Sequence, residues 1–211
     1  MNEDLKQRLI QTAKEKIEGN DPSHDFVHAK RVLSNIEKIQ KEEGGDLEIL
    51  IPAALFHDAV IYAKDDPRSK DAPNESAVLA ESILREEAAY PSDKIEGVAN
   101  AIKECSFHKD TEPEDIETKI LRDADKLEAT GIISIMRTYA SCGQMNRPFY
   151  SPEDPFCENR KPEPFKYALD LFYDRLLIAK DRMYTNTAKE IAEERTEFLE
   201  TFLEELKREL N

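Results

Sequence analysis

The sequence predicts an all-α protein, and three observations favour this fold class. Glutamate, lysine, leucine and alanine dominate the 211 residues, whereas there are only six glycines and no tryptophan. The dominant residues are good helix formers. Apolar residues recur at helical spacing along most of the chain. No segment shows a convincing alternation of apolar and polar residues, and we find no internal repeat or low-complexity tract.

In the first half of the chain, apolar stripes and turn residues mark successive helices. Gly44-Gly45 should end the second helix, and Asn74 should cap the fourth. Residues 47–62 are strongly apolar around Pro52, which predicts a buried central helix. The helical segments expected here are residues 5–17, 26–39, 47–62, 74–84 and 95–107.

The second half should contain helices around a long irregular stretch. Residues 112–140 predict two helical segments on either side of Gly131. Residues 143–164 are rich in proline, glycine and polar groups, so we expect a long loop or lid. Within residues 165–211 we expect two amphipathic helices that pack on the same domain, and a partner-binding or coiled-coil helix is the alternative. The residues at helical spacing along one stripe of the last helix are Ile191, Arg195, Phe198, Phe202, Leu206 and Leu210.

The length and charge of the chain limit its classes of partner. A chain of 211 residues is long enough for one sizeable core, so we expect a single domain over residues 1–211. The net charge of -15 argues against binding to nucleic acid polymers or anionic membranes, which need clustered cations. It does not exclude a small phosphorylated substrate, because a bound divalent metal can supply local positive charge. Amphipathic terminal helices permit a homodimer.

Three features favour a cytoplasmic location. Cys105, Cys142 and Cys157 form an odd set without CxxC spacing, which suits a reducing compartment and structural thiols. The N-terminal segment is too charged for a signal peptide. No apolar stretch approaches the roughly 20 residues that a membrane-spanning helix needs.

The strongest chemical feature is His57-Asp58, a polar pair within an apolar segment. Burying a carboxylate is costly unless it is paired or binds a metal. A hydrogen-bonded pair within the core would explain these two residues about equally well, because buried polar groups are usually satisfied internally.

A second feature is the acidic stretch from Asp123 to Glu128. Asp123 shares the helical stripe of Ile120 and Leu127, so we expect its carboxylate to be functional. Asp125 and Glu128 are better explained as members of a solvated acidic face.

Together with His28, these residues form an ordered set on three expected helices. Two imidazoles and two carboxylates suit a divalent transition metal such as Mn²⁺, Fe²⁺, Co²⁺ or Zn²⁺, and Ni²⁺ or Mg²⁺ are further candidates. Positions left open on the ion would accept water and a phosphate oxygen. The set expected is His28, His57, Asp58 and Asp123.

This order of motifs resembles the HD superfamily of metal-dependent phosphohydrolases. The resemblance covers residues 20–210 and looks closest to the small stand-alone bacterial enzymes, one branch of which is associated with nucleotide pyrophosphohydrolase activity. It implies a helical bundle with His28, His57, Asp58 and Asp123 as ligands of a central metal. The blocks that carry it are SHDFVHAKRV, ALFHDAV, AIKECSFHK, ILRDADKLEATGIISIMRTYA and RMYTNTAKEIAEERTEFLETFLEEL.

Catalytic roles are expected for Asp58, His108 and Lys126. Asp58 would orient the attacking water. His108 would contact a phosphate or act as general acid, although a histidine at a helix C-terminus is also favoured by the helix dipole. Lys126 would reach a phosphate, and a surface lysine paired with a neighbouring aspartate is an equally good explanation.

Other residues are expected beside the substrate or behind the ligands. His24 would lie at the helix start, Arg31 would flank the site, and Glu75 would cap a helix or act behind the ligands. Arg137, like Arg147 and Arg160, is a cation near the expected lid, and an ordinary surface charge is the simpler explanation for each. The candidates are His24, Arg31, Glu75 and Arg137.

We therefore expect hydrolysis of a phosphate ester or anhydride of a small molecule, with a nucleotide as the favoured substrate, by metal-activated water. A 5′-nucleotidase or a phosphodiesterase of the same superfamily is an alternative. A metal- and nucleotide-binding sensor without turnover is another, and a purely structural helical protein is a third. The discriminating observations are the reaction product and the metal content of the purified protein.

Overall fold

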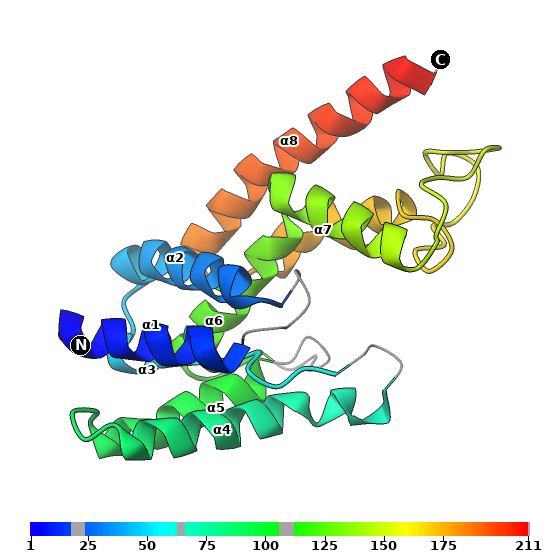
Figure 1. The fold of residues 1–211 in the computed structure, drawn as a ribbon. Coiled ribbons are helices and arrows are strands. Elements are labelled where there is room, and N and C mark those ends of the chain that lie inside the picture. Colours follow the sequence, from blue (N-terminus) through cyan, green and yellow to red (C-terminus); the bar gives the residue numbers. More distant parts are fainter. Residues whose placement is uncertain (18–23, 63–65, 106–111, 211) are drawn as a thin grey trace. The chain divides into compact units, whose positions relative to one another are not determined.

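The computed structural model describes residues 1–17, 24–62, 66–105 and 112–210. All regular structure within these ranges is helical and no strand occurs among them, so the predicted all-α class is confirmed (Figure 1). No helix described is long and apolar enough to cross a membrane. The chain divides into two compact units, Met1–Asp125 and Lys126–Asn211. Each is described by itself, and the single domain expected over residues 1–211 stays a prediction.

The first unit is built around α3, which packs against α1, α2, α4 and α5. Every residue from Leu50 to Phe56 is buried, which confirms that this apolar segment forms the central helix. Short 3-10 turns precede α4 and α5, namely η1 (Pro67–Lys70) and η2 (Ser92–Lys94). The α-helices are α1 (Glu3–Ile17), α2 (Phe26–Glu43), α3 (Leu47–Phe56), α4 (Ala72–Glu86), α5 (Ile95–Glu104) and α6 (Ile116–Lys126).

A proline lies inside this central helix, and a tyrosine compensates for it. Pro52 has no N–H, so the carbonyl of Glu48, four residues earlier, has no helical donor. The phenol of Tyr90 donates to that carbonyl at 2.6 Å. Burial raises the pKa of Tyr90, so the phenol stays protonated as the donor. The connection between α4 and α5 thereby completes the hydrogen bonding of α3.

The central helix is shorter than the sequence predicts. It ends at Phe56, whereas the apolar pattern predicted residues 47–62. The Ala59 N–H turns back to the Phe56 carbonyl at 3.1 Å, and the Val60 N–H donates to the Ser76 hydroxyl. Because these amides have other acceptors, the helix stops, and Asp58 lies just beyond its C-terminus.

Capping residues define the other helix ends. α2 begins after Asp25, whose carboxylate accepts the His28 N–H at 2.8 Å, and ends as predicted at Gly44, where φ is 83°. The prediction that Asn74 caps the fourth helix is wrong. α4 begins at Ala72 after Asp71, because Pro73 suits the first turn of a helix and Asn74 already lies within it.

In the second unit, α8 packs against α7 and two short turns, η3 and η5. Gly131 begins α7 with φ at 63°, so the two helical segments predicted around this glycine are confirmed. A π-helical turn, η4, supplies Phe172 and Leu176 to the core beside Leu199 and Leu203. The elements are η3 (Leu127–Ala129), α7 (Gly131–Gln144), η4 (Phe172–Leu176), η5 (Ala179–Arg182) and α8 (Asn186–Leu210).

α8 buries a face that overlaps only partly with the predicted stripe, of which Phe202 and Leu206 pack against the core, partly buried. Phe198 and Leu210 of the predicted stripe are exposed, by 46% and 38%. The buried residues are instead Ala188, Ala192, Thr196, Leu199 and Leu203. Small alanines in the first turns allow α8 to approach its neighbours closely. Only the packing reveals that this alanine face is the buried one.

The long stretch between α7 and η4 has a defined structure. Asp154 accepts the backbone N–H groups of Glu158 and Asn159. The guanidinium of Arg160 makes two hydrogen bonds to the fully buried carboxylate of Asp170. Arg160 therefore anchors this stretch, and its interpretation as an ordinary surface charge is wrong. The expected role as a lid stays a prediction.

Candidate metal centre

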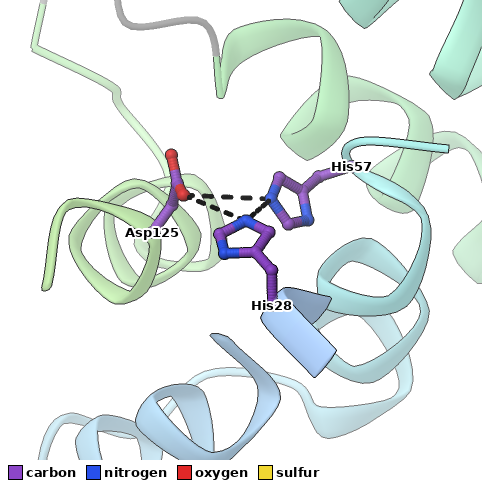
Figure 2. Close-up of side chains that lie close together, drawn as sticks. All are labelled: His28, His57 and Asp125. Atoms are coloured by element: carbon purple, nitrogen blue, oxygen red, sulfur yellow. Dashed lines mark hydrogen bonds and ion pairs between the residues drawn. The ribbon is translucent and has the colours of Figure 1, made fainter. Parts of the chain in front are cut away.

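Three side chains from three helices meet in the first unit. They are His28 in the first turn of α2, His57 at the end of α3 and Asp125 near the end of α6 (Figure 2). The Nε2 atoms of His28 and His57 lie 3.3 Å apart. The Asp125 Oδ1 atom lies 3.5 Å from the first of these nitrogens and 3.9 Å from the second. Two donors on one transition-metal ion, each about 2.1 Å from it, are roughly 3–3.5 Å apart, so the group fits a shared ion.

The local fold of each histidine aims its Nε2 atom at this point. The Asp25 cap fixes the first turn of α2 and therefore the backbone of His28. The Nδ1 atom of His57 lies 2.9 Å from the carbonyl of Ala54. Because a carbonyl only accepts, Nδ1 must carry the proton, and the lone pair of Nε2 faces His28. This is the tautomer that a metal-binding histidine needs.

Asp58 is the fourth polar group at this point. Its Oδ2 atom lies 3.5 Å from Nε2 of His28 and 3.4 Å from Nε2 of His57. Burial raises the pKa of the Asp58 carboxyl, but the neighbouring histidines, above all His57, oppose this and hold that pKa below its ordinary value. Its side chain is still 32% exposed, so the charged carboxylate is accessible from solvent.

The structure brings Asp125, not Asp123, to the histidines. Asp123 is fully buried on α6, whereas the side chain of Asp125 is 25% exposed and its carboxylate faces the imidazoles. The interpretation of Asp125 as part of a solvated face is therefore wrong. Successive residues turn by about 100° in a helix, so residues two apart point in different directions. The apolar stripe correctly identified the side of α6 that faces the core. The metal ligand, however, lies at the edge of that side and not within it.

Asn35 is a residue of this site that the sequence reasoning missed. It is 3% exposed on α2, and its amide donates to the carbonyl of Ala124 at 3.1 Å. This bond fixes α6 against α2 one residue before Asp125. An asparagine on the buried face of a helix, between Val32 and Ile36, was the available signal.

Three further predicted residues lie in the described part of the first unit. The ring of His24 stands edge-on to that of His28, with centroids 6.0 Å apart. Arg31 lies on α2 and is half-buried. Glu75 is exposed and accepts a hydrogen bond from the Tyr62 hydroxyl at 2.7 Å. His24 therefore adjoins a ligand, and the roles expected of Arg31 and Glu75 stay predictions.

Lys126, the predicted catalytic cation, contacts a backbone carbonyl and an aromatic ring of the second unit. The ammonium of Lys126 donates to the Arg182 carbonyl at 2.8 Å and lies 4.1 Å from the centroid of the Tyr184 ring. Arg137 lies on α7 and is half-buried. His108 is outside the residues that the structure describes. The phosphate contacts expected of Lys126 and His108 stay predictions, as does the expected place of Arg137 beside the substrate.

Comparisons with known proteins agree with the observed fold. The model of the HD domain family matches residues 25–130, half of the chain. The chain belongs to this family, as its resemblance predicted. It is 30% identical to the YpgQ protein of Bacillus subtilis over 192 residues, which cover 89% of this chain and 84% of that protein.

Solved structures of similar proteins cover nearly the whole chain. An HD-superfamily hydrolase from Bacillus thuringiensis is 29% identical, with a TM-score of 0.74 and coverage of 98% and 96%. The Lin1889 protein of Listeria innocua is 33% identical, with a TM-score of 0.71 and coverage of 100% and 98%. YpgQ in complex with ADP is 26% identical in structural comparison, with a TM-score of 0.73 and coverage of 98% and 95%.

Proposed function

We propose that this protein is a metal-dependent phosphohydrolase that cleaves a phosphate ester or anhydride of a nucleotide. The observation that carries the proposal is the convergence of His28, His57 and Asp125, with the Asp58 carboxylate beside both imidazoles. Two neutral nitrogen donors and carboxylate oxygens suit Mn²⁺, Fe²⁺, Co²⁺, Ni²⁺ or Zn²⁺.

The choice of a nucleotide rests on two arguments. The related protein YpgQ has been solved in complex with ADP. The chain itself carries a net charge of -15, so a phosphorylated substrate needs a local source of positive charge. A divalent ion held by uncharged histidines supplies it, because the imidazoles leave most of the ion's charge uncompensated.

The side chains of the centre have distinct parts in this reaction. A bound ion supplies a Lewis acid for the phosphoryl oxygen and lowers the pKa of a water molecule. His28 and His57 hold the ion, and the bond from His57 to Ala54 keeps the required tautomer. The pKa of Asp58 lies below its ordinary value, so this side chain is a charged carboxylate at neutral pH. It therefore accepts a hydrogen bond from the attacking water and orients it toward phosphorus.

The test is a product assay with several metals. The purified protein is incubated with Mn²⁺, Co²⁺, Ni²⁺ or Zn²⁺ and a panel of nucleoside mono-, di- and triphosphates and cyclic nucleotides. Pyrophosphate, orthophosphate or a linear nucleotide in the products identifies a pyrophosphohydrolase, a phosphatase or a phosphodiesterase. His57→Ala should abolish the release of any of them. Tight nucleotide binding without any product would overturn catalysis and indicate a sensor.

A further inference from the structure

Two consecutive residues of α4 hold the segment that follows Asp58. The Ser76 hydroxyl accepts the Val60 N–H at 3.0 Å and lies 3.3 Å from the Val60 carbonyl, to which it donates. One side chain thus satisfies both backbone groups of Val60, only two residues after Asp58. Ser76 itself is fully buried.

A second bond ties the same segment to the preceding residue of α4. The Tyr62 hydroxyl donates to the Glu75 carboxylate at 2.7 Å. The Arg68 guanidinium lies 4.4 Å from the centroid of the Tyr62 ring and pairs with Asp66. The backbone after Asp58 therefore has two attachment points on α4, a partly buried one at Val60 and an exposed one at Tyr62.

On its other side, Asp58 is attached to α3. The His57 N–H donates to the Ala53 carbonyl at 3.0 Å, and the Ala59 N–H donates to the Phe56 carbonyl at 3.1 Å. Asp58 thus lies between two fixed points, the last turn of α3 and the Ser76 hydroxyl. The carboxylate that faces both histidines depends on α4 for its backbone position, although α4 contributes no residue to the described metal cluster.

The residue type at position 76 supports a specific role. A serine in a helix interior contributes less to helix formation than alanine does, and the neighbouring buried positions of α4 are Ala77 and Ala80. An alanine would fill the space about as well as the serine. Both described hydrogen bonds of the Ser76 hydroxyl go to Val60. Fixing the backbone after Asp58 therefore explains why position 76 is a serine and not an alanine.

We propose that Ser76 is a positioning residue for the metal centre and keeps the Asp58 carboxylate in register with His28, His57 and Asp125. The Tyr62–Glu75 bond adds a second, weaker attachment. This inference rests on the proposed metal-dependent function. It predicts that a residue making no contact with the ion controls metal affinity through Asp58 alone.

The experiment is a double-mutant cycle read out by metal affinity. Mn²⁺ binding to the full chain is titrated by electron paramagnetic resonance up to millimolar metal. The variants are Ser76→Ala, Asp58→Ala and the double variant. Ser76→Ala should weaken binding about 10- to 100-fold, the range typical for residues that orient metal ligands. In the Asp58→Ala background the same change should have little further effect, because the carboxylate that it positions is absent.

Ser134→Ala is the matched control. Ser134 is a buried serine of α7 whose hydroxyl donates to the Gly131 carbonyl at 2.7 Å. The Ser134→Ala variant therefore loses a buried hydroxyl, as Ser76→Ala does, but at a position outside the metal centre. Its Mn²⁺ affinity should equal that of the wild type. Tyr62→Phe, an exposed and mild change, should weaken binding in the same direction as Ser76→Ala but by less. Circular dichroism of the metal-free proteins checks that each variant folds.

Three outcomes would contradict the proposal, and they can be told apart. Unchanged metal affinity in a folded Ser76→Ala variant would overturn the role of Ser76 and leave the proposed function intact. An equal loss in both backgrounds would show that Ser76 acts on the fold and not through Asp58. Absence of metal binding by the wild type would overturn both the function and this inference.

Discussion

Which aspartate of α6 holds the metal depends on where each side chain points. Asp123 and Asp125 are two residues apart, and both lie in the amphipathic helix α6. Asp123 points into the core of the first unit, whereas Asp125 faces the histidines and remains partly exposed. A metal centre that acts on a substrate must be reached from solvent, so a position at the edge of the core suits a ligand better than one within it.

Asp125→Asn should lower metal affinity strongly, because an amide oxygen replaces the only charged ligand that α6 contributes to the cluster. Asp123→Asn, on the same helix, should keep the metal site and instead lower the free energy of unfolding. Metal content after purification and urea unfolding of both variants measure the two effects. Loss of metal from the Asp123 variant with retention in the Asp125 variant would restore the ligand set predicted from the sequence.

At the scale of single elements, side chains complete backbone or charge pairings that the elements leave open. α3 needs Tyr90, 42 residues after Glu48, to satisfy the carbonyl that Pro52 leaves without a donor. The stretch between α7 and η4 is instead closed on itself, because Arg160 pairs with Asp170 within the same stretch. α3 therefore depends on another part of its unit, whereas the stretch before η4 carries its own partner.

Tyr90→Phe should destabilise the protein by about 1–2 kcal/mol, because it leaves a partly buried carbonyl without its donor. In a Pro52→Ala background the same change should cost less, since the new N–H at position 52 can bond to Glu48 within the helix. Urea unfolding of the four proteins in this cycle measures the difference. Equal costs in both backgrounds would show that the phenol stabilises the protein in some other way.

Asp170→Asn should cost about 3–5 kcal/mol at neutral pH, because it leaves the Arg160 guanidinium without its carboxylate. Burial raises the pKa of Asp170, but hydrogen bonds from Arg160 and the Glu163 N–H lower it overall. A depressed folded-state pKa stabilises the protein above the ordinary aspartate pKa of about 4, and that stability is lost as the pH falls further.

The difference in unfolding free energy between the wild type and Asp170→Asn should therefore be largest near pH 7 and shrink below about pH 4. Urea unfolding at pH 7 and at pH 3 measures it. Asp174→Asn is the control, because Asp174 pairs with Arg175 on the surface and should change stability by less than about 1 kcal/mol at either pH. If the difference in unfolding free energy between the wild type and Asp170→Asn is the same at pH 7 and pH 3, the titration of Asp170 is not its cause.

At the scale of the whole molecule, the metal centre connects α2, α3 and α6 across the core of the first unit. An ion that binds only the folded chain should raise its unfolding free energy by about 2.7 kcal/mol at 100 times its dissociation constant. A thermal melt with and without a chelator measures this shift. His57→Ala should melt at the same temperature in both conditions, and a metal-dependent shift in that variant would place the stabilising ion elsewhere.

Much of this architecture can be predicted from local patterns. Helical periodicity and turn residues located α1, α2, the buried α3 and the break at Gly131, because each depends on residues that are near one another in sequence. The order of His28 and His57-Asp58 indicated the family, which the comparisons confirm. These features could be predicted because composition and local backbone preference are enough to specify them.

The sequence by itself therefore determined the all-α class, the family and the pair of histidines at the candidate centre. Only the tertiary structure decided that α3 stops before Asp58, that α8 buries the face of Leu199, and that Asp125 joins the histidines. The physical reason is the same in each case. A helix repeats its local geometry whatever surrounds it, whereas the direction in which a side chain must point is set by neighbours far away in the chain.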